Sequence, residues 1–128
     1  DPLPRRSRPL GFSEEALEIV RAGLFDVAAL PGGTAHEALN ARDLGFAMCV
    51  KTGSADLSDV AVVTADGSER VPKHTWVAGW FPPEKPVAVL VVFVDDTLAT
   101  AGKSAVWIAR QFLQRPEVQA FARAELGE

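Results

Sequence analysis

Four consecutive residues, Lys51-Thr52-Gly53-Ser54, carry the densest chemical functionality in this sequence. The lysine offers an ammonium group for an anion, the two hydroxyls offer hydrogen bonds, and the glycine leaves a bare backbone that a ligand can approach closely. An apolar run, Phe46–Val50, delivers this tetrapeptide. We therefore predict that a strand ends here and presents an anion-recognition edge of an active site.

Simpler interpretations exist for this tetrapeptide and for the other reactive side chains. Lys51 also fits a strand that ends at solvent, with Thr52-Gly53-Ser54 forming a turn. Cys49 fits a small buried hydrophobic residue, because Lys51 is its only cationic neighbour in sequence and no helix N-terminus adjoins it. His36 is expected in a surface loop, since no pattern of serine and carboxylate surrounds it.

The composition limits the classes of function. With 128 residues and 48% hydrophobic content, the chain has the size and core material of one globular domain. The net charge of -4 gives no basic surface for nucleic acid or for an anionic membrane. A single cysteine excludes an internal disulfide and a multi-cysteine zinc site, and we expect neither a metal nor a cofactor. The longest apolar run, Val87–Val94, is far shorter than the ~18 residues of a membrane span.

The N-terminal part predicts an extended segment and then a helix. Residues 1–12 contain prolines and arginines without periodicity, and the sequence starts at Asp1 without an initiator methionine, so we expect it to be cut from something longer. The helix should run from Ser13, a good N-cap, to Leu30, before the Pro31-Gly32-Gly33 breaker and a short helical turn. Its apolar residues share one stripe that we expect to be buried: Ala16, Ile19, Val20, Gly23, Leu24 and Val27.

Three segments have the composition of main β-strands. Gly45–Val50 and Val87–Val94 are apolar runs typical of buried strands, and the second is expected in the sheet centre, terminated by Asp95-Asp96. His74–Phe81 is rich in aromatic and β-branched residues. Its connection to the Val-rich strand is too short for a parallel crossover, so these two strands should be antiparallel. Residues 57–72 between the strands predict a loop or hairpin excursion.

Two helices are expected after the last strand. The first, capped by Thr97 or Thr100, presents one apolar face: Ala101, Ala105, Ile108, Ala109 and Phe112. The second starts at Pro116, a favourable first-turn residue, and ends before Gly127. The order of elements predicts an α+β fold, in which an antiparallel sheet of three main strands is flanked by helices.

Several segments besides the tetrapeptide follow one another in a specific order. They are the helix before Gly33-Thr34-Ala35, then Lys51 to Ala55, His74 to Pro82, the Val-rich strand, and a helix that opens near Gly102. Lys-Thr-Gly is also the third motif of β-lactamases and penicillin-binding proteins. The series, from about Ser13 to Leu113, resembles the C-terminal part of a class B penicillin-binding protein transpeptidase domain. The resemblance implies the fold shared by these proteins and serine β-lactamases, with residues 13–128 as the C-terminal part of the domain.

The resemblance implies a role for each residue of the tetrapeptide. Lys51 would draw the carboxylate of a D-Ala-D-Ala stem peptide, or of a β-lactam, and would support proton movement. Thr52 and Ser54 would offer hydroxyls to that carboxylate, and Gly53 would let the substrate lie against the strand. The backbone N–H of Ser54 would be one of two oxyanion-hole donors. Lys51 and Ser54 are thus the expected catalytic residues, and Thr52, Gly53 and Ser54 the expected substrate contacts.

The sequence also departs from the family pattern. Neither Ser-x-x-Lys nor Ser-x-Asn occurs in the 128 residues, so the acylated serine is expected outside this chain. Val50 stands where a small residue, usually glycine, is expected. We therefore expect a piece of a peptidoglycan D,D-transpeptidase that is inactive alone and needs its N-terminal remainder to complete core and site.

These expectations extend to the protein's surroundings. The parent protein would act at the outer face of the cytoplasmic membrane or in the periplasm, with cell-wall elongation or division proteins as further partners. The isolated chain should expose a sheet edge and apolar helix faces, and should aggregate. One alternative is a non-catalytic sensor or interaction module. A β-lactamase is disfavoured, because the strand after Lys-Thr-Gly resembles transpeptidases more closely.

Overall fold

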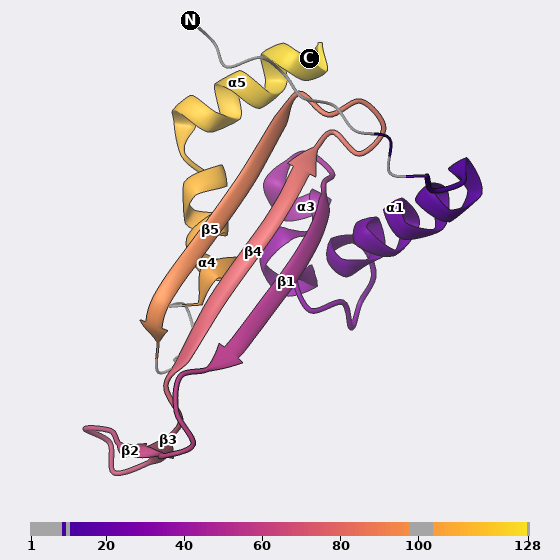
Figure 1. Cartoon of the computed structure of the whole chain (residues 1–128). Helices are drawn as coiled ribbons and strands as arrows, with labels where there is room; N and C mark the ends of the chain where they lie inside the picture. The colour runs from indigo at the N-terminus through magenta and orange to yellow at the C-terminus, as the bar shows by residue number, and fades with distance from the viewer. Residues whose placement is uncertain (1–8, 10, 98–103, 128) are drawn as a thin grey trace, which may run out of the picture.

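The computed structural model describes residues 9, 11–97 and 104–127, and it has the expected α+β architecture. Three long strands form one antiparallel sheet, and helices lie against it (Figure 1). The strands are β1 (Cys49–Asp56), β4 (Lys73–Phe81) and β5 (Ala88–Thr97). The longer helices are α1 (Glu14–Ala29), α4 (Ala105–Leu113) and α5 (Pro116–Leu126), and the short elements are α2 (His36–Leu39), α3 (Ala41–Leu44), β2 (Val62–Val63) and β3 (Glu69–Arg70).

The strand order is β1-β4-β5, so the centre of the sheet is β4 and not the Val-rich strand. The expectation that Val87–Val94 is central was therefore wrong. Its apolar composition does not mean burial on both faces, because Val89, Val91 and Phe93 are exposed on one of them. The strand also continues through Asp95-Asp96 to Thr97. An acidic residue can continue the strand because the Asp95 side chain is exposed to solvent, next to His74 of β4.

The tetrapeptide lies inside β1 and does not follow its end, which corrects the predicted strand Gly45–Val50. Gly45 has a positive φ of 84° and terminates α3, so the chain becomes extended only later. From Cys49 onward every residue to Asp56 pairs with β4, in a register that joins Lys51 to Ala78 and Gly53 to Trp76. The alternative in which Lys51 ends a strand and a turn follows is excluded by this pairing.

The two faces of the sheet differ in their covering. Residues on one face pack with α4 into a hydrophobic core, and the Thr75 hydroxyl there accepts a 3.0 Å hydrogen bond from the Ala105 N–H at the start of α4. The core comprises Ala28, Ala35, Ala38, Leu39, Leu44, Phe46, Met48, Val50, Val77, Phe81, Ala105, Ala109, Leu113 and Ala122. The opposite face, which we call the outer face, carries Trp76, Val89, Val91 and Phe93, and all four side chains are exposed.

Helix α1 starts as predicted but is less buried than its sequence indicates. The Ser13 hydroxyl accepts a hydrogen bond from the Ala16 N–H, which confirms the N-cap. The predicted buried stripe is wrong, because Ile19 is 68% and Val20 57% exposed, and Ala28 is the one residue of the helix that is fully buried. The physical reason is that the helix diverges from the sheet toward its N-terminus, so β1 is approached by its middle and C-terminal parts (Figure 1).

The C-terminal helices lie where they were predicted, but the buried face of α4 differs from the predicted one. Helix α5 starts at Pro116 and ends at Gly127, which has a positive φ of 76°. Helix α4 starts after Ser104, and its buried residues Ala105, Ala109 and Leu113 are spaced by four, whereas Ile108 and Phe112 are exposed. The proposed cap Thr97 lies in β5, and Thr100, Ala101 and Gly102 fall outside the described residues. The same holds for residues 1–8 and 10 of the predicted extended segment.

The excursion between β1 and β4 is a hairpin made by β2 and β3, as predicted. Gly67 adopts a positive φ of 81° in its turn, and Asp66 accepts hydrogen bonds from Ser68 and from Thr64. These bonds hold the pKa of the Asp66 carboxyl well below its usual range. Within the described ranges, no helix combines the length and apolar character that crossing a membrane requires.

Candidate functional site

The candidate site is built on β1, whose outer edge has no strand beside it in the described part of the chain. Antiparallel residues alternate between hydrogen-bonded and non-hydrogen-bonded pairs. The Leu57 N–H donates to the Pro72 carbonyl at 2.8 Å, and this pair continues the register of β1 and β4. Counting back from Leu57 by twos, the backbone groups of Gly53 face β4. Those of Ser54, one residue on, therefore face the free edge.

The Lys51 ammonium also reaches the free edge. Its Nζ donates a 2.7 Å hydrogen bond to the carbonyl oxygen of Thr52, whose backbone groups point outward by the same alternation. The lysine side chain is exposed. A cation and the outward N–H of Ser54 thus lie along one stretch of strand edge. Both groups attract negative charge, so this edge can receive a carboxylate or an oxyanion.

The hydroxyls of the tetrapeptide are on the opposite side of the strand from the lysine. Thr52 and Ser54 share one face because side chains alternate along a strand. Ser54 is exposed, while Thr52 is half-buried and its Oγ1 lies 2.8 Å from Oγ1 of Thr34. Thr34 belongs to the connection between α1 and α2. It is the site neighbour that sequence analysis missed, although Gly33-Thr34-Ala35 already stood out as part of the family resemblance.

Gly53 has a packing role in addition to the expected one. It pairs directly with Trp76 of β4, and a Cβ at position 53 would overlap the indole ring. We expected the glycine to admit a substrate to the strand surface. On the outer face, the space above Gly53 is occupied by Trp76, so the open approach to Lys51 and Ser54 is along the strand edge.

Residues before the tetrapeptide are buried and carry no exposed chemistry. Val50 is fully buried in the core, so its volume beyond that of glycine is accommodated by packing. Cys49 is 1% exposed, and burial, with a smaller contribution from Glu84, raises the pKa of its thiol. The thiol is therefore protonated at neutral pH, which agrees with its prediction as a small buried hydrophobic residue.

His36 and Asp43 stabilise the elements behind the site. The expectation that His36 lies in a surface loop was wrong. This residue begins α2, where its Nδ1 lies 3.0 Å from the carbonyl oxygen of Ala28. Asp43 accepts hydrogen bonds from Asn40 and Arg110, and these lower the pKa of its carboxyl. Arg110 also donates to the carbonyl oxygens of residues 37 and 38, so it ties α2 and α3 to α4. No group of three metal-ligating side chains occurs among the residues that the structure describes.

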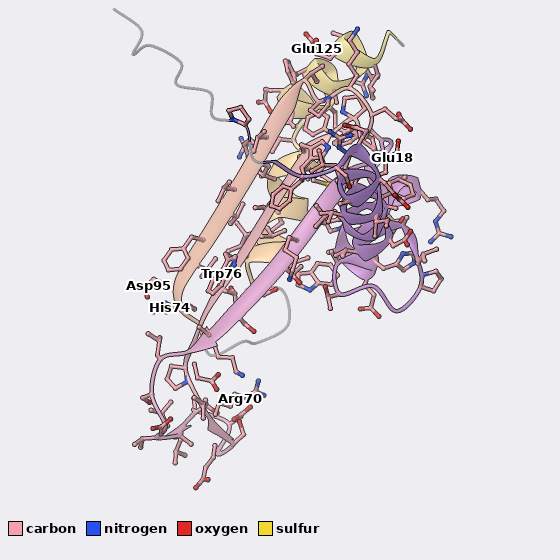
Figure 2. All side chains as sticks on the ribbon, turned by 45° about the vertical axis from the view of Figure 1, so that its right-hand side comes forward. Glu18, Arg70, His74, Trp76, Asp95 and Glu125 are labelled. Atoms are coloured by element: carbon pink, nitrogen blue, oxygen red, sulfur yellow. The ribbon has the colours of Figure 1, made fainter. Side chains whose placement is uncertain are left out.

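The outer face beside the candidate site carries aromatic, charged and apolar side chains. Figure 2 shows Trp76, His74 and Asp95 together near the hairpin end of the sheet. His74 Nδ1 lies 2.8 Å from Asp95 Oδ1, although the angles at this contact are not those of a hydrogen bond. Val91 and Phe93 extend the apolar surface across β5, at 67% and 58% exposure. Lys51 and Gly53 share this face by alternation.

Comparison with protein families identifies a family for this chain. The family model described as the penicillin binding protein transpeptidase domain matches residues 4–114. This match covers all three strands of the sheet, β1, β4 and β5, and helices α1 to α4. A search of curated proteins finds no match for the chain. The family match supports a transpeptidase role in peptidoglycan synthesis and, in general, binding of peptidoglycan substrate and β-lactams.

Proposed function

This chain belongs to the penicillin-binding protein transpeptidase family, and from that membership we propose that it is the carboxylate-binding and oxyanion-stabilising part of a serine D,D-transpeptidase. The observation that carries the proposal is the common free edge shared by the Lys51 ammonium and the outward N–H of Ser54. The substrate is a peptidoglycan stem peptide ending in D-Ala-D-Ala, and β-lactams bind as its mimics.

Each residue has a defined role in the proposed reaction. Lys51 attracts the terminal carboxylate and supports proton movement, and the Thr52 and Ser54 hydroxyls donate hydrogen bonds to it. The N–H of Ser54 stabilises the negative charge that develops on the scissile carbonyl oxygen. Because this N–H belongs to a strand that is paired along its whole length, it is held in place before the substrate arrives.

The nucleophile is a serine outside this chain, since no Ser-x-x-Lys occurs in it. We propose that the segment carrying this serine covers the outer face of the sheet. That face bears Lys51 and also the exposed apolar residues Trp76, Val89, Val91 and Phe93, which need covering by a large apolar surface. The assembled protein acts at the outer face of the cytoplasmic membrane, in the Lys-Thr-Gly class B branch of the family, with elongation or division proteins as partners.

Labelling by a radioactive or fluorescent penicillin tests the function. The protein that contains this chain together with its upstream segment should form a covalent, hydrolysis-resistant adduct at one serine, located by peptide mass mapping. The 128-residue chain alone should form none. If the longer protein shows no adduct, the catalytic proposal is wrong and a non-catalytic sensor or interaction module takes its place. Rapid turnover of the penicillin would instead indicate a β-lactamase.

A further inference from the structure

The contact between Thr34 and Thr52 joins the candidate site to a segment 18 residues earlier. The two Oγ1 atoms are 2.8 Å apart, and in the free protein either hydroxyl can donate the proton. Thr34 is exposed and makes no contribution to the hydrophobic core. Its side chain therefore has little reason to be ordered apart from this hydrogen bond.

The backbone around Thr34 is nevertheless held firmly. The Gly33 N–H donates to the Leu30 carbonyl at 2.9 Å, and the Ala35 N–H donates to the Val27 carbonyl at 3.1 Å. Ala35 is 1% exposed. A Cβ at Gly33 would overlap the backbone at Val27, so the glycine lets this segment lie directly on the end of α1. Thr34 is thereby presented to β1 by the residues on both sides of it.

The chemistry of a carboxylate removes the ambiguity in this hydroxyl pair. An ionised carboxylate accepts hydrogen bonds and cannot donate them, and a threonine hydroxyl has a single proton to give. When Thr52 donates to the substrate carboxylate, the proton of the Thr34–Thr52 bond has to come from Thr34. Two hydroxyls in series then polarise each other toward the negative charge.

We propose that Thr34 is a positioning residue for carboxylate recognition: by donating to Thr52 Oγ1, it orients the Thr52 hydroxyl so that its proton points to the ligand. This inference rests on the proposed function, because it takes Thr52 as a carboxylate contact. It assigns a role to a residue outside the strand that bears Lys51. Thr34 itself does not touch the ligand.

The test compares acylation by benzylpenicillin with acylation by its methyl ester, in the protein that contains this chain and its upstream segment. The ester keeps the reactive ring but lacks the negative carboxylate. Thr34→Val removes the hydroxyl and nearly conserves shape, whereas Thr34→Ser retains a hydroxyl. Thr34→Val should lower the acylation rate for the free acid about three- to tenfold, the range for one lost hydrogen bond, and leave the ester rate unchanged. Thr34→Ser should restore the acid rate.

The possible outcomes separate the two proposals. An unchanged acid rate in Thr34→Val, with acylation by the wild type intact, overturns the positioning role alone. Equal losses for acid and ester also overturn it, since they indicate a purely structural effect. If Thr34→Val lowers the melting temperature, Thr34→Ala replaces it, since it removes the hydroxyl without an added methyl group. The ratio of the acylation rate for the free acid to that for the ester then tests the positioning role in the same way. A wild type that neither compound acylates overturns the proposed function, and this inference with it.

Discussion

The indole of Trp76 lies over Gly53, its direct partner across the strand pair, and fills the space that any side chain at position 53 would need. The glycine of the tetrapeptide is therefore explained by packing within this chain, before any substrate is considered. Gly53 and Trp76 form a pair that should change together. This relationship leads to the first prediction.

Gly53→Ala should destabilise the protein by about 1–3 kcal/mol, the usual cost of forcing an extra group into a filled site. Trp76→Ala opens the space, so the Gly53→Ala, Trp76→Ala double variant should lose less than the sum of the single losses. Urea denaturation of all four proteins gives the coupling energy. Strict additivity would show that the two residues do not meet in solution.

Lys51→Ala should slow acylation by penicillin by about a hundredfold or more in the assembled protein, because it removes the positive group from the strand edge where we propose that the carboxylate binds. Lys73→Ala is the matched control. Lys73 is also a lysine of the β1–β4 pair, but it is half-buried and its Nζ lies 2.8 Å from Asp56 Oδ1. A surface ion pair contributes little, so this variant should be acylated normally. Similar rates in both variants would contradict the role given to Lys51.

Val91→Lys should reduce aggregation of the isolated 128-residue chain, because Val91 is exposed on the outer face and the charge breaks an apolar patch. Val92→Lys, one residue on, places the same charge among residues that pack against the core and should unfold the chain. Light scattering and circular dichroism distinguish these results. A wild-type chain that is already monodisperse and unfolds cooperatively would show that the outer face needs no cover.

Asp43→Asn should lower the melting temperature at neutral pH, with the difference disappearing in acid. Hydrogen bonds from Asn40 and then from Arg110 lower the pKa of Asp43 in the folded protein from its ordinary value of 3.8. A lowered pKa stabilises the fold above the unfolded-state value, and this stabilisation is lost as pH falls below about 4 through the folded pKa. Asp59→Asn, at an exposed carboxylate in the hairpin, is the control and should leave the melting temperature at neutral pH unchanged. A difference of the same size at neutral and at acidic pH would exclude the carboxylate as its cause.

Local patterns predicted most of the elements but not how the strands are ordered. Ser13, Pro116 and Gly127 mark helix ends through chemistry that acts over one turn, and the structure confirms them. The centre of the sheet could not be predicted in this way, because a Val-rich run reads as buried on both faces wherever it lies. The stripe on α1 misled for a related reason: an apolar face shows that burial is favourable, and it does not show what provides the cover.

In the candidate site, too, the sequence motif could be recognised locally, whereas the tertiary contacts could not. Lys51 and Ser54 could be proposed as site residues from the sequence because both belong to one four-residue segment that contains a known motif. The contact of Gly53 with Trp76 depends on a register that is set by the length of the intervening hairpin. The contact of Thr34 with Thr52 depends on a glycine-rich segment packed on the end of α1. Both are tertiary relationships, which no local periodicity encodes.

The free edge of β1 in the described part of the chain also restricts the register in which an extended peptide can pair with it. Outward backbone groups occur at every second residue, so hydrogen bonds recur about every 7 Å along the strand, twice the rise per residue. A peptide displaced by one residue would therefore set its own donors against inward-facing positions and would lose the entire ladder. In the proposed function Thr52 contacts the terminal carboxylate and Ser54 the scissile carbonyl oxygen, so the fixed distance between these two residues would favour a chain end over an internal peptide bond.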